Sequence, residues 1–196
     1  MNRPLFEGKL IRLVALEPER DAEKIASWGK DSDYQRLQVI SPAVRYSTRL
    51  VRSWYEKEGH QGHAFMIQTL ADGQMIGFLE LDGFDWAAGT AWVGIGIGER
   101  EYQGKGYGTD AMKALLFYAF TELNLHRVNL NVFSYNHRAI RSYEKAGYRY
   151  EGTQRERILR EDQRWDVLDM GILRSDWEQT REREESEAQT AAVAPA

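Results

Sequence analysis

Alternating apolar and polar residues, many of them β-branched or aromatic, mark seven short stretches of the chain and predict strands. The stretches are residues 8–16, 63–70, 74–84, 90–98, 126–133, 148–159 and 164–173. Turn sequences separate neighbouring strands at three places: ADG at 71–73, DWAAG at 85–89 and REDQ at 160–163. We therefore expect three strands in succession in the middle of the chain and a hairpin at its end.

Apolar residues at helical spacing predict four helices among these strands. The helices cover residues 17–31, 47–60, 109–123 and 136–147. Ser47 or Thr48 suits the N-cap of the second helix, and Asn136 and Gly147 suit the two ends of the last one. A mostly antiparallel sheet with helices on its faces follows from this order, which is an α+β domain.

Composition limits the functions that the chain can have. Its 196 residues suffice for one domain with a core, which we place at residues 1–177. Residues 178–196 hold five Glu and two Arg, a pattern typical of a charged, disordered tail. This tail accounts for most of the formal net charge of −4, and no basic stripe favours a nucleic-acid partner.

Two features that the sequence lacks exclude further kinds of site and partner. Cysteine does not occur, which excludes disulfides, thiolate metal sites and a cysteine nucleophile. No apolar stretch reaches membrane-spanning length. We expect a cytoplasmic protein, a monomer or a homodimer, with no membrane partner.

Three glycines stand directly before the third predicted helix, within residues 99–109. Such a turn offers unpaired N–H groups and the positive end of the helix dipole, which together bind anions, most often phosphate. The spacing fits neither a nucleotide P-loop nor the dinucleotide fingerprint. What remains is Gln-x-x-Gly-x-Gly at Gln103, Gly106 and Gly108, with a plain glycine-rich turn as the alternative.

This hexapeptide resembles the pyrophosphate loop of the GCN5-related N-acetyltransferases, the GNAT family, which bind acetyl-CoA. A second segment, residues 136–148, is similar to the helix that follows the fifth strand in that family. The family pattern Asn-x-x-Ala-x-x-x-Tyr-x-Lys-x-Gly-aromatic is matched by Asn136, Ala139, Tyr143, Lys145, Gly147 and Tyr148. The resemblance covers about residues 8–177, and it is nearest to the branch with ribosomal-protein alanine and polyamine acetyltransferases.

The resemblance implies a mixed, mostly antiparallel sheet of six to seven strands, splayed between its fourth and fifth strands. It also implies acetyl-CoA as co-substrate, with its pantetheine arm in that gap, and no metal. The residues expected to bind the cofactor are Ile95, Gly96, Ile97, Gln103, Gly104, Lys105, Gly106, Tyr107, Gly108, Thr109, Asn131, Asn136, Ser142 and Tyr143. The glycines of the fourth strand would leave its backbone uncovered for the cofactor, the alternative being a kinked edge strand.

Amine attack on a thioester needs an oxyanion donor and a group that stabilises the leaving thiolate. We assign the first role to a main-chain N–H within residues 95–97. We assign the second to Tyr143, acting by hydrogen bonding more than by full proton transfer, because a tyrosine is a weaker acid than a thiol.

The attacking amine must also lose a proton. Many relatives place a glutamate two residues before the position of Gly94, but Trp92 stands there in this chain. Glu80, Asp82 or Asp166 could act as the base through water, and we place Glu80 and Asp82 among the catalytic residues.

The sequence thus predicts an acetyl-CoA-dependent N-acetyltransferase that acts on a primary amine, a peptide N-terminus or a small amine. Because a strong local base is missing at Trp92, we expect an acceptor amine of low pKa to be preferred over lysine or a polyamine. The alternative is a non-catalytic acyl-CoA-binding module that serves as a sensor or interaction partner.

Overall fold

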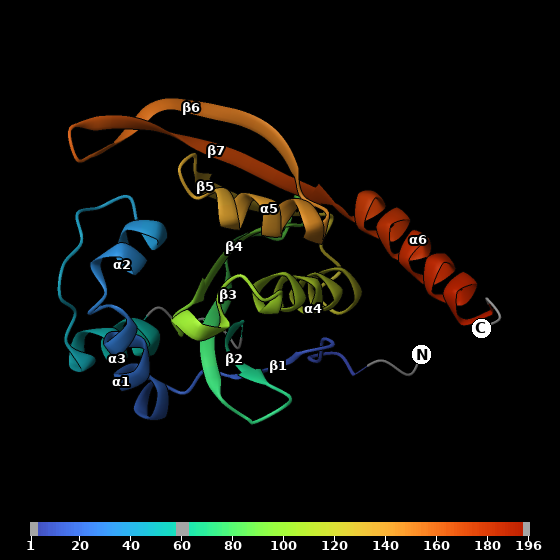
Figure 1. Ribbon diagram of the computed structural model, residues 1–196, viewed down its shortest axis with the longest axis horizontal. Coiled ribbons are helices and arrows are strands. Elements are labelled where there is room, and N and C mark those ends of the chain that lie inside the picture. The colour runs from blue at the N-terminus through green and yellow to red at the C-terminus, as the bar shows by residue number, and fades with distance from the viewer. Residues whose placement is uncertain (1–3, 58–62, 194–196) are drawn as a thin grey trace.

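A seven-stranded sheet with helices on both faces makes up the centre of the protein (Figure 1). The structure is a computed structural model that describes residues 4–57 and 63–193. The strands are β1 (Ile11–Ala15), β2 (Ala64–Thr69), β3 (Met75–Asp85), β4 (Thr90–Ile97), β5 (Arg127–Phe133), β6 (Arg149–Arg160) and β7 (Gln163–Leu173). Their order is β1-β2-β3-β4-β5-β7-β6, and only β4 and β5 run parallel. The predicted α+β class and the mixed sheet are confirmed.

The helices are α1 (Pro18–Trp28), α2 (Ser32–Gln38), α3 (Thr48–Lys57), α4 (Tyr107–Thr121), α5 (His137–Ala146) and α6 (Arg174–Val193), with a 3-10 turn at Arg100–Tyr102. The caps fall where the sequence placed them. Ser47 Oγ accepts the N–H of Leu50 at 3.2 Å, and Asn136 Oδ1 accepts the N–H of Ala139 at 3.2 Å. Gly147 ends α5 with a φ of 105°. Residues 58–60 of the expected second helix lie outside the described residues.

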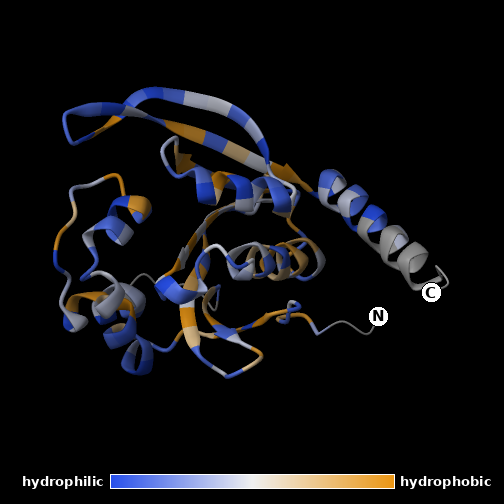
Figure 2. Ribbon diagram, viewed as in Figure 1, coloured by the Kyte–Doolittle hydropathy of each residue, from blue (hydrophilic) through white to orange (hydrophobic). Residues whose placement is uncertain are grey.

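Alternate residues of each strand supply two different cores, because successive side chains point to opposite faces of a sheet. Leu79 and Leu81 pack with α4 in the larger core, where Met112 and Leu115 are fully buried. Phe78, their neighbour in sequence, packs on the other face with residues of α1 and α2. Figure 2 shows the apolar residues of α4 and the sheet, against the mostly polar surface helices.

The sheet splits between β4 and β5, as the sequence predicted. These strands pair only at Thr90–Trp92 with Arg127–Asn129. Beyond Trp92 the β5 side of β4 has no strand partner, and β5 follows β7 along its whole length instead. The protein therefore has two blocks of sheet that meet at three residue pairs and open into a gap.

Helix α2 is an element that the sequence analysis missed. It has only seven residues, too few for an apolar period to be read. A signal was present nevertheless, because Asp31 caps the helix by accepting the N–H groups of Asp33 and Tyr34 at 3.0 and 3.3 Å. This omission matters, because α2 forms part of the site described below.

Helix α6 continues to Val193, through most of the segment 178–196 for which the sequence favours a charged, disordered tail. Its start is anchored by Trp177, which is 7% exposed and packs on Phe120 at 5.2 Å between ring centroids. Arg181 lies over the Trp177 ring at 5.0 Å. Beyond that anchor the polar helix projects away from the body (Figure 1), and the division into one domain at 1–177 and a tail stays a prediction.

Candidate active site

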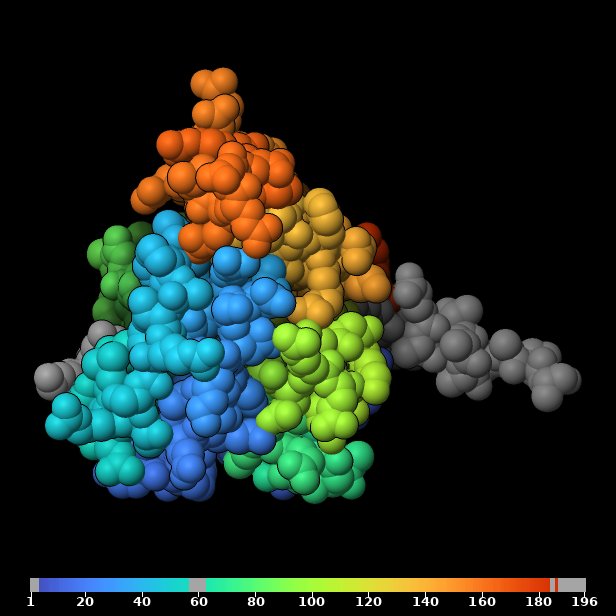
Figure 3. All heavy atoms as spheres, turned by 60° about the vertical axis from the view of Figure 1, so that its left-hand side comes forward, coloured from blue at the N-terminus to red at the C-terminus, as the bar shows by residue number. Residues whose placement is uncertain are grey.

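A cavity of about 990 Å³ lies beside the part of β4 that has no partner on its β5 side. Its wall comes from the loop before β1, from α2, from β4, from the turn before α4 and from α5. In Figure 3 the segments of α1 and α2 (blue), the turn (yellow-green) and α5 (gold) meet on one face. Segments more than 100 residues apart in sequence thus share one site.

The glycine-rich turn forms one end of this cavity. Gly104 and Gly106 have φ values of 74° and 93°, and Gly106 is the N-cap of α4. Only glycine adopts such angles readily. A Cβ on Gly104 would meet no atom within 4 Å, so the turn opens onto free space. The first N–H groups of α4 have no partners within the helix and suit a diphosphate there.

Two side-chain contacts hold this turn in place. Gln103 donates from Nε2 to the carbonyl oxygen of Ile97 at 2.7 Å, and its Oε1 accepts from Arg138 Nη1 at 2.8 Å. Thr109 and Ser142 share a hydroxyl hydrogen bond of 2.7 Å between α4 and α5. The motif glutamine therefore ties the turn to β4 on one side and to α5 on the other.

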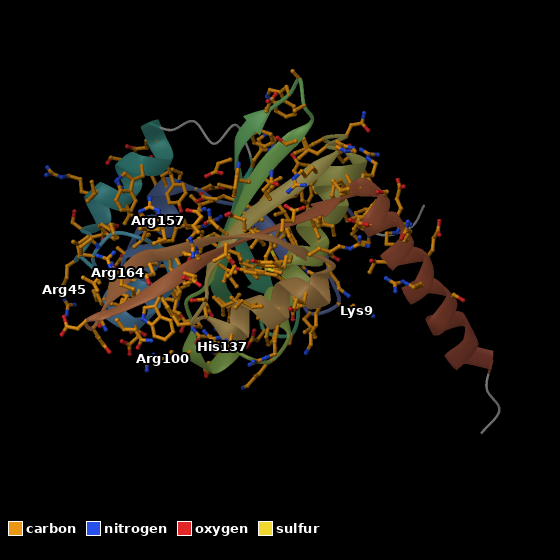
Figure 4. All side chains as sticks on the ribbon, turned by 90° about the horizontal axis from the view of Figure 1, so that it is seen from above. Lys9, Arg45, Arg100, His137, Arg157 and Arg164 are labelled. Carbon is orange, nitrogen blue, oxygen red and sulfur yellow. The ribbon has the colours of Figure 1, made fainter. Side chains whose placement is uncertain are left out.

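Five cationic side chains line the same end: Lys9, Lys113, Arg138, Arg141 and Lys145. Sequence analysis considered only Lys105, which is exposed and does not line the cavity. The signal was available, because residues 138, 141 and 145 recur on one face of a helix. Figure 4 shows Lys9 well apart from Arg45, Arg157 and Arg164. We call the end of the cavity that the glycine-rich turn forms the phosphate end.

Asp110, an acidic residue at this end, is already engaged. Its carboxylate accepts the N–H groups of Lys9, Leu10 and Ile11 at 3.0, 2.7 and 3.2 Å. The carboxylate thereby fastens the loop before β1 to the first turn of α4. It also holds Lys9 at the wall of the cavity.

Along β4, successive main-chain N–H groups point alternately to β3 and to the gap between β4 and β5. The N–H of Gly98 donates to Ile76 of β3 at 2.9 Å, so Gly94 and Gly96, which share its phase, also face β3. The N–H groups of Ile95 and Ile97 consequently point to the gap, and both residues line the cavity. Of the three donors expected for the oxyanion, these two have the right direction and Gly96 does not.

The glycines at positions 94, 96 and 98, in and directly after β4, lie against side chains of the protein. A Cβ on Gly98 would lie 2.1 Å from the Trp28 ring, and one on Gly96 would lie 2.3 Å from the Tyr34 hydroxyl. A Cβ on Gly94 would lie 3.5 Å from Glu80 Oε1. The glycines therefore make room for protein side chains on the α1 and α2 side of the sheet.

Tyr143 lies on α5 and lines the cavity. Burial raises the pKa of its hydroxyl to about 12. The side chain is therefore protonated throughout the physiological range and is able to donate a hydrogen bond into the cavity.

The candidate bases lie elsewhere. Glu80 and Asp82 are on β3, opposite Gly94 and Trp92, and neither lines the cavity. Asp166 accepts the N–H of Glu156 at 2.8 Å and so belongs to the closing hairpin. Trp92 is 40% exposed, stands opposite Asp82 of β3 and does not line the cavity.

Ten of the expected cofactor residues line the cavity: Ile95, Ile97, Gln103, Gly104, Gly106, Gly108, Thr109, Asn136, Ser142 and Tyr143. Four do not: Gly96, Lys105, Tyr107 and Asn131. Asn131 pairs with Asp169 across β5 and β7. Tyr107 instead packs edge-on against Tyr102 at 5.3 Å. Sequence reasoning missed Tyr34, Leu37 and Gln38, the contribution of α2.

Two searches of residues 4–57 and 63–193 gave negative results. No helix there is both long and apolar enough to span a bilayer. The same residues hold no cluster of three or more His, Cys, Asp or Glu suited to a metal ion.

A split sheet beside a cationic, glycine-lined anion site, with a tyrosine at the split, is the arrangement that the resemblance implies for a transferase that takes its acyl group from a diphosphate-bearing carrier. The family model of the acetyltransferase (GNAT) domain matches residues 11–149, most of the chain. The protein belongs to this family and is an acetyl-CoA-dependent N-acetyltransferase.

Individual relatives agree with this assignment. The SPbeta prophage-derived uncharacterized N-acetyltransferase YokL of Bacillus subtilis is 29% identical over 173 residues, which is 88% of this chain and 95% of YokL. Spermidine N(1)-acetyltransferase of Vibrio cholerae is 33% identical over 123 residues, 62% of this chain and 70% of that protein. A crystal structure of the Vibrio cholerae spermidine N-acetyltransferase with CoA and spermine has a TM-score of 0.76 at 28% identity, covering 85% of this chain and 97% of that one.

Proposed function

We propose that the acceptor is a primary amine of low pKa, such as the α-amine of a peptide or a small amine. One observation carries this proposal: among the described residues, no carboxylate belongs to the part of the wall formed by Tyr34, Leu37, Gln38, Ile95 and Tyr143, which we call the uncharged end. The two acidic lining residues are Glu7 and Asp110. Glu7 lies 3.6 Å from Arg12 and precedes Gly8, which packs against the Asp110 carboxylate; Asp110 itself accepts backbone N–H groups at the start of α4, so both acids belong to the phosphate end.

Where no carboxylate can take up the proton, the free energy of deprotonating the amine decides which acceptor reacts faster. For a lysine-like amine with a pKa near 10.4, forming the neutral amine at pH 7 costs about 4.6 kcal/mol; for an α-amine near 7.7 it costs about 1 kcal/mol. The difference of about 3.6 kcal/mol favours the α-amine several hundredfold where no base helps. An uncharged wall also disfavours a polycation, which is usually bound by acidic groups.

The relatives that act on spermidine support the rival acceptor class, a polyamine. Trp92 counts against it, because it fills the strand position where many relatives carry a glutamate. Both possibilities are primary amines, and the pKa of the amine separates them.

In the proposed site the phosphates of acetyl-CoA lie at the turn, near Gly104, Gly106 and the cations of α5. Its thioester supplies the acetyl group at the uncharged end. The N–H groups of Ile95 and Ile97 point to where the carbonyl oxygen gains negative charge, and they stabilise it. Tyr143 donates a hydrogen bond to the departing sulfur.

Glu80 is the proposed base, acting through water. It lies on β3 beside Gly94, whereas Asp82 is two residue pairs further along the strands, opposite Trp92, and exposed. A base that does not line the cavity and acts through water assists only weakly, which is consistent with a preference for amines that are already neutral.

A panel of three acceptors tests the proposal: a lysine-free peptide with a free N-terminus, a blocked peptide with one lysine, and spermidine. Rates are measured as CoA released, and products are located by mass spectrometry. We expect the free N-terminus to react fastest at pH 7, with the lysine peptide gaining on it as the pH rises to 9. Faster reaction of spermidine or lysine at pH 7 would contradict the proposal.

The same panel tests the relay. Glu80→Gln should slow the lysine peptide more than the α-amine peptide at pH 7, because the former depends more on help with deprotonation. Asp82→Asn is the matched control and should leave both rates within about twofold. Equal rates for Glu80→Gln and wild type would remove Glu80 from the site.

A further inference from the structure

The Tyr34 hydroxyl is a buried polar group that the site described so far does not use. The residue is 8% exposed, and its ring packs in a small core with Trp28 and Met66. Its hydroxyl oxygen is buried and has no hydrogen-bond partner within the described residues. An unsatisfied hydroxyl in such a place is unfavourable, and removing it is ordinarily neutral or stabilising.

The hydroxyl stands directly over the backbone of β4. The Cβ position of Gly96 lies 2.3 Å from the Tyr34 oxygen and 3.0 Å from Gln38 Oε1. Gly96 sits between Ile95 and Ile97, whose N–H groups face the gap. Tyr34 therefore reaches the strand at the point where the oxyanion donors lie, and it lines the cavity itself.

Tyr34 and Tyr143 approach the uncharged end of the cavity from different elements. Tyr143 comes from α5, which also carries cations of the phosphate end. Tyr34 comes from α2, whose other lining residues, Leu37 and Gln38, bear no charge. The carrier thus occupies the α5 side, and the α2 side is left for the incoming amine.

Helix α2 is held firmly enough to position a side chain. At its start, Arg100 Nε donates to Asp31 Oδ2 at 2.8 Å. At its end, the Tyr135 hydroxyl donates to the carbonyl oxygen of Arg36 at 2.6 Å, and Arg160 Nη2 donates to that of Val39 at 2.9 Å. Contacts to both blocks of the sheet therefore fix α2 across the gap.

We propose that Tyr34 is an acceptor-site residue whose hydroxyl oxygen accepts a hydrogen bond from the attacking amine and so aims its lone pair at the thioester carbon. The carbon–nitrogen bond forms as the carbon–sulfur bond breaks, and the amine proton leaves to water, because the phenol is protonated and only orients the nitrogen. This inference rests on the N-acetyltransferase activity and holds for whichever amine is accepted.

The test is Tyr34→Phe, assayed with the amine of the panel that wild type acetylates fastest. We expect kcat/KM for the amine to fall roughly tenfold, the loss of one hydrogen bond, while KM for acetyl-CoA stays unchanged and Tm does not fall. The wild-type rate with the same amine reports on the proposed function separately.

Tyr118→Phe is the matched control, because the Tyr118 hydroxyl is bonded to His63 Nδ1 at 3.0 Å outside the cavity. It should lower Tm and leave the amine kinetics alone. Gly96→Ala is a second variant: its Cβ would displace the Tyr34 hydroxyl, so it should slow the amine reaction in wild type and have less effect in Tyr34→Phe. Unchanged amine kinetics in Tyr34→Phe, or a lower Tm with no kinetic loss, would overturn the proposal.

Discussion

Tyr143 illustrates how a single side chain can be chemically defined by its surroundings. Burial raises the pKa of its hydroxyl to about 12. Transfer of that proton to a thiolate with a pKa near 8.5 is uphill by roughly 5 kcal/mol, so hydrogen bonding is the role that remains. The hydroxyl is protonated at every pH below its pKa, and its donor function is lost only as the pH rises through about 12.

We predict that Tyr143→Phe lowers kcat about 10- to 100-fold and changes the Kd for acetyl-CoA by less than threefold, because the lost hydrogen bond forms only as the sulfur departs. Steady-state kinetics and calorimetry measure the two quantities. The wild-type rate should also show no decline assignable to Tyr143 between pH 8 and 10. Equal turnover of the two proteins would reduce Tyr143 to a packing residue.

At the scale of elements, the proposed position of the acetyl-CoA phosphates depends on the turn before α4. Gly106 has a φ of 93°, so any replacement there strains the backbone. Gly106→Ala and Gly106→Glu share that strain, but only the second adds a carboxylate beside the proposed phosphate position. Their comparison therefore separates strain from charge.

We predict that Gly106→Glu weakens acetyl-CoA binding at least tenfold more than Gly106→Ala, because it sets a negative charge at the helix N-terminus where the diphosphate lies. Calorimetry gives both affinities, and circular dichroism checks that each variant is folded. Similar affinities for the two variants would mean that the turn does not hold the phosphates.

The elements also show how far sequence can lead. Long periodic segments such as α4 and α5 were predicted because apolar spacing is a local signal, and α5 was predicted together with its caps, Asn136 and Gly147. The seven-residue α2 was missed, although it places Tyr34 in the cavity. Residues 178–196 were expected to be a disordered tail because they are rich in charge, whereas α6 runs from Arg174 to Val193 and its anchor, Trp177, packs on Phe120, which lies far away in sequence.

The sequence could predict those site residues that belong to a local motif, but not those that depend on contacts between segments far apart in the chain. Gln103 and Tyr143 belong to motifs that a resemblance reveals. The direction of the Ile95 and Ile97 N–H groups depends on the register between β3 and β4. The side chains that lie against Gly96 and Gly98 come from α2 and α1, which are distant in sequence. No local pattern encodes such pairs of distant segments.

The whole molecule consists of two sheet blocks, β1–β4 and β5–β7–β6, that meet at three residue pairs. Asp110 binds the segment at the start of β1, in the first block, and α5 connects β5 to β6 of the second block. The cofactor site needs both blocks at once, because its wall includes Ile97 of β4 and Tyr143 of α5.

This division has a consequence for protein synthesis. Strand β5 is one wall of the gap, yet its main partner is β7, which leaves the ribosome after every residue that lines the cavity. A nascent chain of 148 residues already contains the glycine turn and α5 but lacks the strand that supports β5. We expect such a chain not to be retained on immobilised CoA, and one of 177 residues to be retained; retention of the shorter chain would show that the site matures before its sheet is complete.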